Sequence, residues 1–355
     1  MTALIRVLVV DDSAFVRKVV KEMLVRGGAF DVVGLARDGE EALELAERLH
    51  PDVITLDLVM PRMNGVEFLR EQNRRRRIPV VVCSIAHQSG EMALEAFEAG
   101  AVEFVQKPTA LATDRVYEIA AELVAKVAAA ARVALAGSAE SSGAVAPARV
   151  AGPAKAVRRT GRSAGPRLCD VVVLGISTGG PQALRQLIPQ LTRDFPVPIV
   201  MVLHMPVGYT EMYAQRLNSV AVLDVSEARE GDVLRPGRVL LAPAGRHLTF
   251  ARDGVDVVTH LDDRPAESQH RPSVDVLFQS AADVFGARVL GVVMTGMGND
   301  GLLGAAHIKA QGGRIVTEAE SSCVVYGMPR AVAEASLSDR SATLDEMADA
   351  IVEMI

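Results

Sequence analysis

Two patterns of apolar and polar residues alternate along this chain. Short runs rich in Val, Ile and Leu, typical of buried strands, are each followed by a longer stretch with apolar residues at helical spacing. The alternation covers residues 1–130 and resumes over residues 169–355. Repeated strand–helix units favour parallel sheets with helices on both faces, so we predict an α/β chain with two doubly wound domains.

The first segment is predicted to form a sheet of five parallel strands. Its strands are expected at Ile5–Val10, Asp31–Ala36, Val53–Asp57, Val80–Cys83 and Glu103–Val105. Its helices are expected at Ala14–Val25, Asp38–Leu49, Asn64–Asn73, Gly90–Ala99 and Asp114–Ala131. In such a sheet the ligand site lies beyond the carboxyl ends of the strands.

The last segment is predicted to form a second, mostly parallel sheet with some antiparallel edge. Its strands are expected at Asp170–Gly175, Ile199–Leu203, Arg238–Ala242, Val255–Thr259, Val289–Met294 and Arg314–Thr317. Its helices are expected at Pro181–Leu191, Tyr209–Asn218, Ser273–Phe285, Leu302–Ala310, Pro329–Ala335 and Leu344–Glu353.

Residues 131–168 have a different composition from the rest of the chain. Ala, Gly, Ser, Pro and Arg dominate this stretch, and large apolar residues are almost absent. Such a segment cannot bury enough apolar surface to offset the entropy cost of ordering it. We therefore predict a flexible linker between the two domains.

The most informative chemical motif lies where the first strand of the second domain ends. Gly175, Ser177 and Gly179 meet the pattern Gly-x-Ser-x-Gly, which places nucleophilic serines at strand-to-helix turns. Pro181 suits the first turn of the helix that follows. Main-chain N–H groups at such a helix start are able to bind a negative oxygen, so Ser177 is the first candidate catalytic residue.

A serine nucleophile needs a base within hydrogen-bond reach and a third group that orients this base. Two other strands of the second domain end near suitable residues: His204 follows one, and Asp300 follows the other after a turn of small residues. We expect all three side chains at the carboxyl edge of one sheet. The remaining histidines fall in the first domain or in loops, weak strands and a helix, and are weaker candidates: His50, His87, His247, His260, His270 and His307.

Polar residues also follow the strands of the first domain. Asp11 and Asp12 follow the first strand, Asp57 ends the third, Ser84 follows the fourth and Lys107 follows the fifth. Three carboxylates on one rim suit a hard divalent cation such as Mg²⁺. A hydroxyl and a lysine beside them are suited to hold the oxygens of a phosphoryl group.

Composition and charge narrow the class of protein. A net charge of −6 and a pI near 5.7 argue against a nucleic-acid binder. Three scattered cysteines imply neither a disulfide framework nor a metal cluster, which fits a reducing compartment. No signal-peptide pattern and no apolar stretch of bilayer length are found, so we expect a cytoplasmic protein without membrane insertion.

Over about residues 4–125 the chain resembles the receiver domain of bacterial two-component response regulators, which has a flavodoxin-like fold. The resemblance implies that Asp57 accepts a phosphoryl group from a histidine kinase. It also implies that Asp11, Asp12, Asp57 and the main-chain carbonyl of Val59 hold Mg²⁺. The positions that respond to the phosphoryl group correspond to Ser84, Phe104 and Lys107.

Three motifs of the second domain resemble those of the chemotaxis protein-glutamate methylesterases of the CheB family. They lie at residues 175–180, 204–206 and 295–301. The resemblance implies that Ser177 is the nucleophile, that His204 is the general base and then acid, and that Asp300 orients His204. Supporting roles are implied for Thr178, the main-chain N–H of Met297, Arg271 and Ser273.

The same resemblance implies the domain order and the reaction. A receiver domain (1–130), a linker (131–168) and a catalytic methylesterase domain (169–355) are expected. The enzyme would hydrolyse glutamate γ-methyl esters on the cytoplasmic domains of chemoreceptors and release methanol, and some family members also deamidate receptor glutamines. Phosphorylation is expected to activate the ester hydrolysis, which needs no cofactor, in a monomeric protein.

Three other interpretations stay open at this point. Gly175, Ser177 and Gly180 also approach a Gly-x-Gly-x-x-Gly nucleotide-binding loop, although the middle glycine is replaced. A receiver domain could regulate a DNA-binding output domain, but the second half contains many strands and lacks a basic recognition helix. A methylesterase of the same chemistry could also serve receptor-like arrays that control outputs other than swimming.

Overall fold

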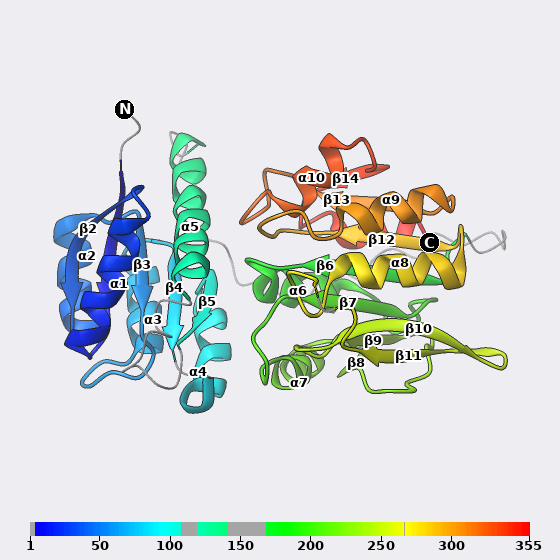
Figure 1. Cartoon of the computed structure of the whole chain (residues 1–355), viewed down its shortest axis with the longest axis horizontal. Helices are drawn as coiled ribbons and strands as arrows, with labels where there is room; N and C mark the ends of the chain where they lie inside the picture. Colours follow the sequence, from blue (N-terminus) through cyan, green and yellow to red (C-terminus); the bar gives the residue numbers. More distant parts are fainter. Residues whose placement is uncertain (1–3, 85, 108–118, 141–167, 266) are drawn as a thin grey trace. The chain divides into compact units, whose positions relative to one another are not determined.

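The computed structural model describes residues 4–84, 86–107, 119–140, 168–265 and 267–355. The chain divides into two compact units, Met1–Ser142 and Gly143–Ile355, coloured blue to teal and green to red in Figure 1. The division falls inside the segment 131–168 that is predicted to be a linker. Residues 141–167 of that segment lie outside the described residues.

The first unit contains the predicted sheet of five parallel strands, in the order β2-β1-β3-β4-β5. The strands are β1 (Ile5–Val10), β2 (Phe30–Ala36), β3 (Val53–Leu56), β4 (Val80–Ser84) and β5 (Glu103–Gln106). The helices are α1 (Ala14–Arg26), α2 (Gly39–Leu49), α3 (Gly65–Arg75), α4 (Ala86–Glu98) and α5 (Ala120–Glu140). This strand order is the doubly wound, flavodoxin-like one, so the predicted fold class of this unit is confirmed.

Side-chain caps mark where three of these helices begin. Ser13 accepts a hydrogen bond from the N–H of Val16, Asp38 caps α2 in the same way, and Asn64 forms a capping box with Glu67 at the start of α3. Helix α5 ends differently from the prediction, since it continues through the first ten residues of the expected linker. Its alanine-rich sequence explains the difference, because alanine is the strongest helix former and not only a small linker residue.

The second unit is built on a sheet of seven strands in the order β14-β13-β12-β6-β7-β9-β8. Its strands are β6 (Val171–Ile176), β7 (Ile199–Leu203), β8 (Asp224–Glu227), β9 (Arg238–Leu241), β12 (Val289–Val293), β13 (Arg314–Glu318) and β14 (Arg340–Ala342). Its helices are α6 (Gly180–Leu187), the 3₁₀ turn η2 (Ile188–Gln190), α7 (Thr210–Val220), α8 (Val274–Phe285), α9 (Leu302–Ala310), α10 (Met328–Glu334) and α11 (Met347–Glu353). The predicted doubly wound class is confirmed for this unit as well.

The edges of the seven-stranded sheet differ from the prediction. All of its strand pairs are parallel, so the expected antiparallel edge is wrong. Among the described residues, antiparallel pairing is found in a separate hairpin of β10 (His247–Asp253) and β11 (Asp256–Asp262) and in one isolated bridge. Strands β8, β10 and β14 were not predicted. The edge strands β8 and β14 are polar and only three or four residues long.

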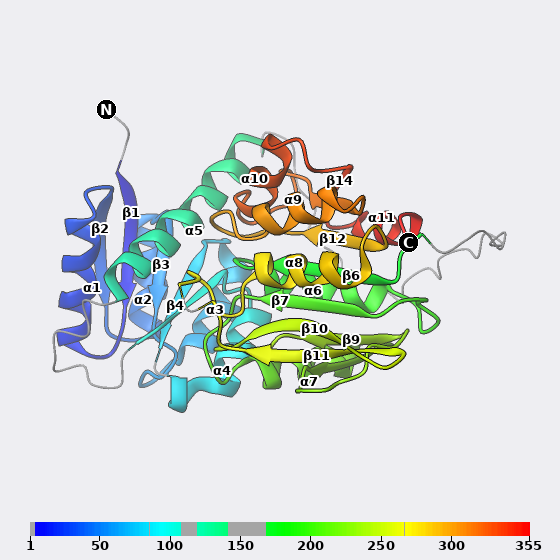
Figure 2. The same cartoon turned by 45° about the vertical axis from the view of Figure 1, so that its right-hand side comes forward.

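Helices α8 and α9 lie side by side over one face of this sheet, whereas α6 lies on the other (Figures 1 and 2). Right-handed crossovers require this arrangement, because the chain leaves β6 toward β7 but leaves β12 toward β13, in the opposite direction. Gly291 of β12 lies directly beneath both helices. A Cβ at this position would meet Ile315 at 2.6 Å, Ile308 at 3.0 Å and Phe278 at 3.2 Å.

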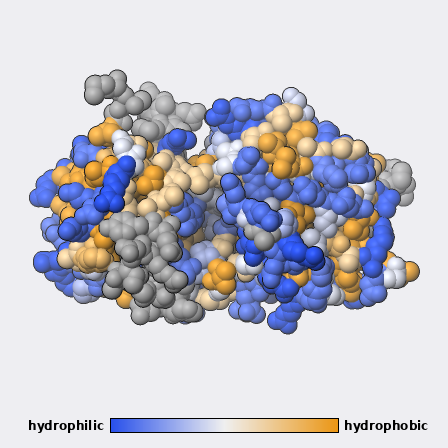
Figure 3. Space-filling model, in the orientation of Figure 1, coloured by the Kyte–Doolittle hydropathy of each residue, from blue (hydrophilic) through white to orange (hydrophobic). Residues whose placement is uncertain are grey.

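The surface of the molecule carries apolar residues in patches that hydrophilic residues separate, on the face that Figure 3 shows. Among the described residues, no helix combines the length and the apolarity that crossing a bilayer requires.

We predict that Leu277→Ala lowers the free energy of unfolding of the second unit by about 2–5 kcal/mol. Leu277 is fully buried in the core beneath α8, so its truncation leaves a cavity. Urea unfolding of the full chain, followed by circular dichroism and tyrosine fluorescence, measures the change. Leu303→Ala is the matched control, since Leu303 is 64% exposed, and its effect is expected within about 0.5 kcal/mol. Equal effects of the two substitutions would contradict the packing described.

Candidate active site

Three adjacent strands end together at one edge of the seven-stranded sheet. Strand β6 pairs with β7 on one side and with β12 on the other. The N–H of His204 donates to the carbonyl of Ile176 at 3.2 Å, and the N–H of Ser177 donates to the carbonyl of Thr295 at 2.9 Å. The parallel pairing therefore brings Ser177, His204 and the start of the Asp300 turn to the same carboxyl edge, as the sequence predicts.

The imidazole of His204 is held by the carboxylate of Asp300. Its Nε2 lies 2.9 Å from Oδ2 of Asp300. An ionised carboxylate only accepts hydrogen bonds, so Nε2 carries a hydrogen, and in the neutral imidazole the free lone pair is then on Nδ1. Nδ1 is buried and has no hydrogen-bond partner among the described residues, and none is found there for the hydroxyl of the half-buried Ser177. The nitrogen that is able to take a proton is thus the one that Asp300 does not occupy.

Asp300 is itself fixed by the start of helix α8. The N–H groups of Val274 and Asp275 donate to its two oxygens at 2.8 and 2.9 Å, and the Ser273 hydroxyl donates at 2.9 Å. Burial alone would raise the pKa of Asp300. The hydrogen bond and charge interaction with His204, together with the main-chain donors, outweigh burial and lower this pKa to about 2. Asp300 is therefore ionised throughout the neutral range.

A close approach of two loops sets the surroundings of Ser177. A Cβ on Gly296 would lie 2.9 Å from Cβ of Ser177 and 2.3 Å from Sδ of Met328, so only glycine fits at this position. The next residue, Met297, has a main-chain N–H without a hydrogen-bond partner among the described residues. An N–H that is free at this point is suited to receive a negative oxygen on a substrate bound to Ser177.

Thr178, Ser273 and Arg271, the other residues with a predicted supporting role, make different contacts. Thr178 is buried, and its carbonyl accepts the Thr295 hydroxyl at 2.9 Å. Ser273 is the N-cap of α8, and its hydroxyl also donates to Asp300, so it caps the helix and supports the site at the same time. For Arg271, the structure places the main-chain carbonyl within reach of the Gly245 N–H at 2.9 Å.

Two residues near this edge have contacts that sequence reasoning missed. The ring of His270 stacks on that of His204, with centroids 4.1 Å apart and planes 20° from parallel. Asp275 directs its carboxylate to helix α9, and burial raises its pKa to about 6. Their position in the run 270–275 was the only hint in the sequence, because stacking and capping between distant segments leave no periodic pattern.

A third missed residue lies beneath the Thr295 turn. Glu318, at the end of β13, is fully buried and accepts the Thr295 N–H at 2.8 Å and the Ser322 hydroxyl at 3.0 Å. Burial raises the pKa of Glu318, and these donors only partly oppose the shift. Glu318 thereby fixes the turn whose carbonyl accepts the N–H of Ser177.

The first unit also gathers its predicted polar residues. The carboxylate oxygens of Asp11, Asp12 and Asp57 lie within 4.8 Å of one another. Lys107 places its Nζ 2.5 Å from Asp11 and 2.8 Å from Asp57. Burial, together with the charge of Asp57, raises the pKa of Asp11, although Lys107 opposes this shift. Three oxygen donors at this spacing fit a hard divalent cation.

The other residues predicted for this rim surround the carboxylates at the strand ends. Ser84 ends β4 and is buried, and its carbonyl accepts the Lys107 N–H at 2.9 Å. Phe104 is buried in β5, three residues before Lys107. Val59 is 45% exposed and follows Asp57 by two residues.

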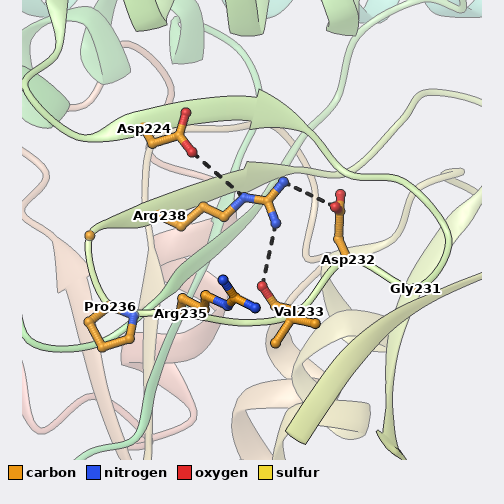
Figure 4. Close-up of a pocket in the computed structure, with 8 residues that line it drawn as sticks. Asp224, Gly231, Asp232, Val233, Arg235, Pro236 and Arg238 are labelled. Atoms are coloured by element: carbon orange, nitrogen blue, oxygen red, sulfur yellow. Dashed lines mark hydrogen bonds and ion pairs between the residues drawn. The ribbon is translucent and has the colours of Figure 1, made fainter.

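A shallow pocket at the opposite edge of the second sheet has different chemistry (Figure 4). It lies at the amino ends of β8 and β9, and Arg238 pairs there with Asp232 at 3.0 Å and with Asp224 at 3.9 Å. The charges of its lining residues are thus largely compensated within the protein. The pocket contains none of the predicted catalytic residues.

Comparisons with family models and with known proteins agree on one family. Residues 172–351 match the family model of the CheB methylesterase, and residues 7–116 match that of the response regulator receiver domain. The chain is 51% identical over 344 residues to "Protein-glutamate methylesterase/protein-glutamine glutaminase 5" of Myxococcus xanthus, covering 97% of this chain and 96% of that protein. It is 40% identical to the protein-glutamate methylesterase/protein-glutamine glutaminase of Halalkalibacterium halodurans, covering 99% of both.

A solved structure agrees with these relatives. The catalytic domain of the CheB methylesterase of Thermotoga maritima is 38% identical to this chain, with a TM-score of 0.52. The match covers 53% of this chain and 99% of that structure.

We predict that Glu318→Gln raises the free energy of unfolding relative to the parent chain as the pH increases above 4.5. A raised folded-state pKa means that the protonated Glu318 contributes stability fully below its ordinary value of 4.5, and that this contribution is lost as the pH rises through the folded value. Glutamine imitates the neutral form, so it avoids the loss. Urea unfolding between pH 4.5 and 9 measures the difference.

The control for this prediction is Glu320→Gln, which changes an exposed carboxyl two residues away. It is expected to show no such pH-dependent gain. A difference between Glu318→Gln and the parent chain that stays constant with pH would rule out the raised pKa.

Proposed function

The chain belongs to the CheB methylesterase family, and from this premise we propose that it hydrolyses glutamate γ-methyl esters on the cytoplasmic domains of chemoreceptors. The reaction releases methanol and restores a glutamate carboxylate, which resets receptor signalling during adaptation. Deamidation of receptor glutamines, with ammonia as the leaving group, is the same acyl-transfer chemistry. The relatives' names, which include protein-glutamine glutaminase, support this second activity.

The observation that carries the proposal is the hydrogen bond between His204 and Asp300, beside a serine at the same sheet edge. The Nδ1 of His204 takes the proton of the Ser177 hydroxyl as its oxygen attacks the ester carbonyl. Asp300 stabilises the imidazolium that forms, because its own pKa is held at about 2 and it stays ionised. No metal is needed in this step.

The tetrahedral intermediate then collapses to an acyl-serine, which water hydrolyses in a second stage. The oxyanion binds the main-chain N–H of Met297, while the Thr178 carbonyl holds the Thr295 hydroxyl and the Ser273 hydroxyl holds Asp300. Imidazolium returns its proton to the leaving methoxide, so methanol departs and an acyl-serine remains. A water molecule, deprotonated by Nδ1, hydrolyses the acyl-serine and regenerates Ser177.

The first unit is the regulatory partner in this proposal. Asp57 accepts a phosphoryl group from a histidine kinase. Asp11, Asp12, Asp57 and the carbonyl of Val59 would hold Mg²⁺, which would neutralise charge on the phosphoryl oxygens. Lys107 and Ser84 bind these oxygens, and Phe104 responds to the binding of the phosphoryl group. Phosphorylation then relieves inhibition of the catalytic domain by the receiver domain.

The proposal keeps the predicted domain bounds of 1–130, 131–168 and 169–355. It places a monomeric enzyme in the cytoplasm, where the kinase and the receptor domains are found. Packing supports catalysis over nucleotide binding at the Gly175–Gly180 turn, because a Cβ on Gly180 would lie 2.5 Å from the Leu203 side chain. That glycine accommodates a neighbouring strand, so its presence does not require a phosphate.

We predict that Ser177→Ala reduces methanol release from methylated receptor membranes by a factor on the order of 10³–10⁶, since it removes the nucleophile. Radiolabelled methyl groups make the released methanol measurable. Ser219→Ala, at an exposed serine of α7, is the matched control and is expected to keep the parent rate. Substantial methanol release by Ser177→Ala would refute the acyl-serine mechanism.

We predict that Asp57→Asn leaves basal esterase activity intact but abolishes its increase with Mg²⁺ and a small-molecule phosphodonor. Asparagine preserves the shape of the rim and cannot form the acyl phosphate. The measurement is methanol release with and without phosphodonor. Asp31→Asn, at an exposed position of β2, serves as the control and should respond like the parent chain. A full response by Asp57→Asn would remove Asp57 from the acceptor role.

A further inference from the structure

The starts of helices α8 and α9 lie against each other beside His204. A Cβ on Gly304 would lie 2.5 Å from Cβ of Phe278 and 3.0 Å from Cα of Asp275, so glycine permits this contact. Each helix start presents main-chain N–H groups that need acceptors. Gly301, the N-cap of α9, has no side chain with which to supply one.

Two carboxylates accept hydrogen bonds from these N–H groups, and each binds the start of the helix to which the other belongs. Asp300, which precedes the N-cap Gly301 of α9, accepts from the N–H groups of Val274 and Asp275 in α8. Asp275 in turn accepts with one oxygen, Oδ1, from Gly301 at 2.9 Å and from Gly304 at 2.7 Å in α9. Each helix start therefore holds the carboxylate that belongs to the other, and we name this arrangement the reciprocal cap.

The reciprocal cap fixes the backbone on which Asp300 is mounted. The Gly301 N–H that Asp275 binds belongs to the peptide group joining Asp300 to Gly301. Gly301 has φ of +98°, a region that glycine enters and leaves without steric cost. Without the Asp275 side chain, this N–H would lose its acceptor. The N–H groups of Val274 and Asp275 would still bind the carboxylate of Asp300, but the backbone that carries it would be held less firmly.

We propose that Asp275 is a positioning residue for the esterase reaction, acting through Asp300 on the orientation of His204. This inference rests on the proposed function, since it assigns Asp300 the role of orienting the base. Asp275 itself does not touch the substrate. Its carboxylate is partly buried close to a second one, an arrangement that costs stability unless main-chain donors compensate it.

Two substitutions of Asp275 distinguish the effect of its hydrogen bonds from the effect of its charge. The structure gives both accepted hydrogen bonds to Oδ1, and asparagine retains an oxygen in that place. Asp275→Asn therefore keeps the reciprocal cap, whereas Asp275→Ala removes it. The charge of Asp275 and its hydrogen bonds are thereby separated.

We predict that Asp275→Ala lowers kcat for methanol release about 10- to 100-fold, with KM changed less than about 3-fold, because misplacing a catalytic group impairs the chemical step more than binding. Asp275→Asn is expected to recover kcat to within about 3-fold of the parent. Asp349→Ala, which removes an exposed first-turn carboxylate from α11, is the control and should match the parent chain.

A proton NMR measurement tests the geometry without relying on catalysis. The Nε2 hydrogen of His204 in its bond to Asp300 is expected to give a far-downfield resonance, assigned by its loss in His204→Gln. This resonance should disappear in Asp275→Ala and persist in Asp275→Asn, while methyl resonances of the core stay in place. If Asp275→Ala does not fold, Asp275→Ser, which lacks the Oδ1 that binds Gly301 and Gly304, takes its place.

The outcomes separate the two proposals. Parent-like kcat and an unchanged His204 resonance in Asp275→Ala would overturn the positioning role while leaving the esterase proposal intact. Equal losses in Asp275→Ala and Asp275→Asn would also overturn it, because the charge and not the reciprocal cap would then be responsible. Retained methanol release in Ser177→Ala would instead defeat the proposed function itself.

Discussion

The hydrogen bonds of the Asp300 carboxylate hold together the sheet edge that carries Ser177 and His204. This carboxylate is buried, and a buried charge is costly unless hydrogen bonds compensate it. Here His204, the Ser273 hydroxyl and two N–H groups of α8 supply that compensation, so the pKa of Asp300 falls to about 2 despite burial. One carboxylate thus joins β7, α8 and the loop after β12 at a single point.

The receiver unit also contains buried carboxylates, and a different partner compensates their charge. Asp11 and Asp57 are also buried carboxylates at the carboxyl edge of a parallel sheet, but a lysine side chain holds both. Parallel pairing explains why both sites lie where they do, since every strand of such a sheet ends at the same edge. The edge with Asp300 uses an imidazole, a hydroxyl and main-chain donors. The receiver rim uses charge, which suits binding of a cation and an anion.

The glycines of the second unit show how packing limits the sequence near the site. Gly175 lies against Val274 of α8, Gly296 against Ser177 and Met328, and Gly304 against the start of α8, and a Cβ at any of them would collide with a neighbour. Helix α8 is therefore drawn close enough for its N-terminal donors to reach Asp300. The same closeness makes the reciprocal cap with Asp275 possible.

The sequence by itself determined the two sheets, most strand and helix positions, and the residues gathered at each edge, because strand periodicity and strand-end polarity are local properties. It failed where local patterns are silent: the polar edge strands β8 and β14, the helical start of the expected linker, and the parallel edge of the second sheet. Only the tertiary structure decided which nitrogen of His204 faces Asp300, and that His270, Asp275 and Glu318 support this edge. These contacts join segments far apart in the chain, and their energies depend on burial and on hydrogen bonds that exist only after the helices have packed.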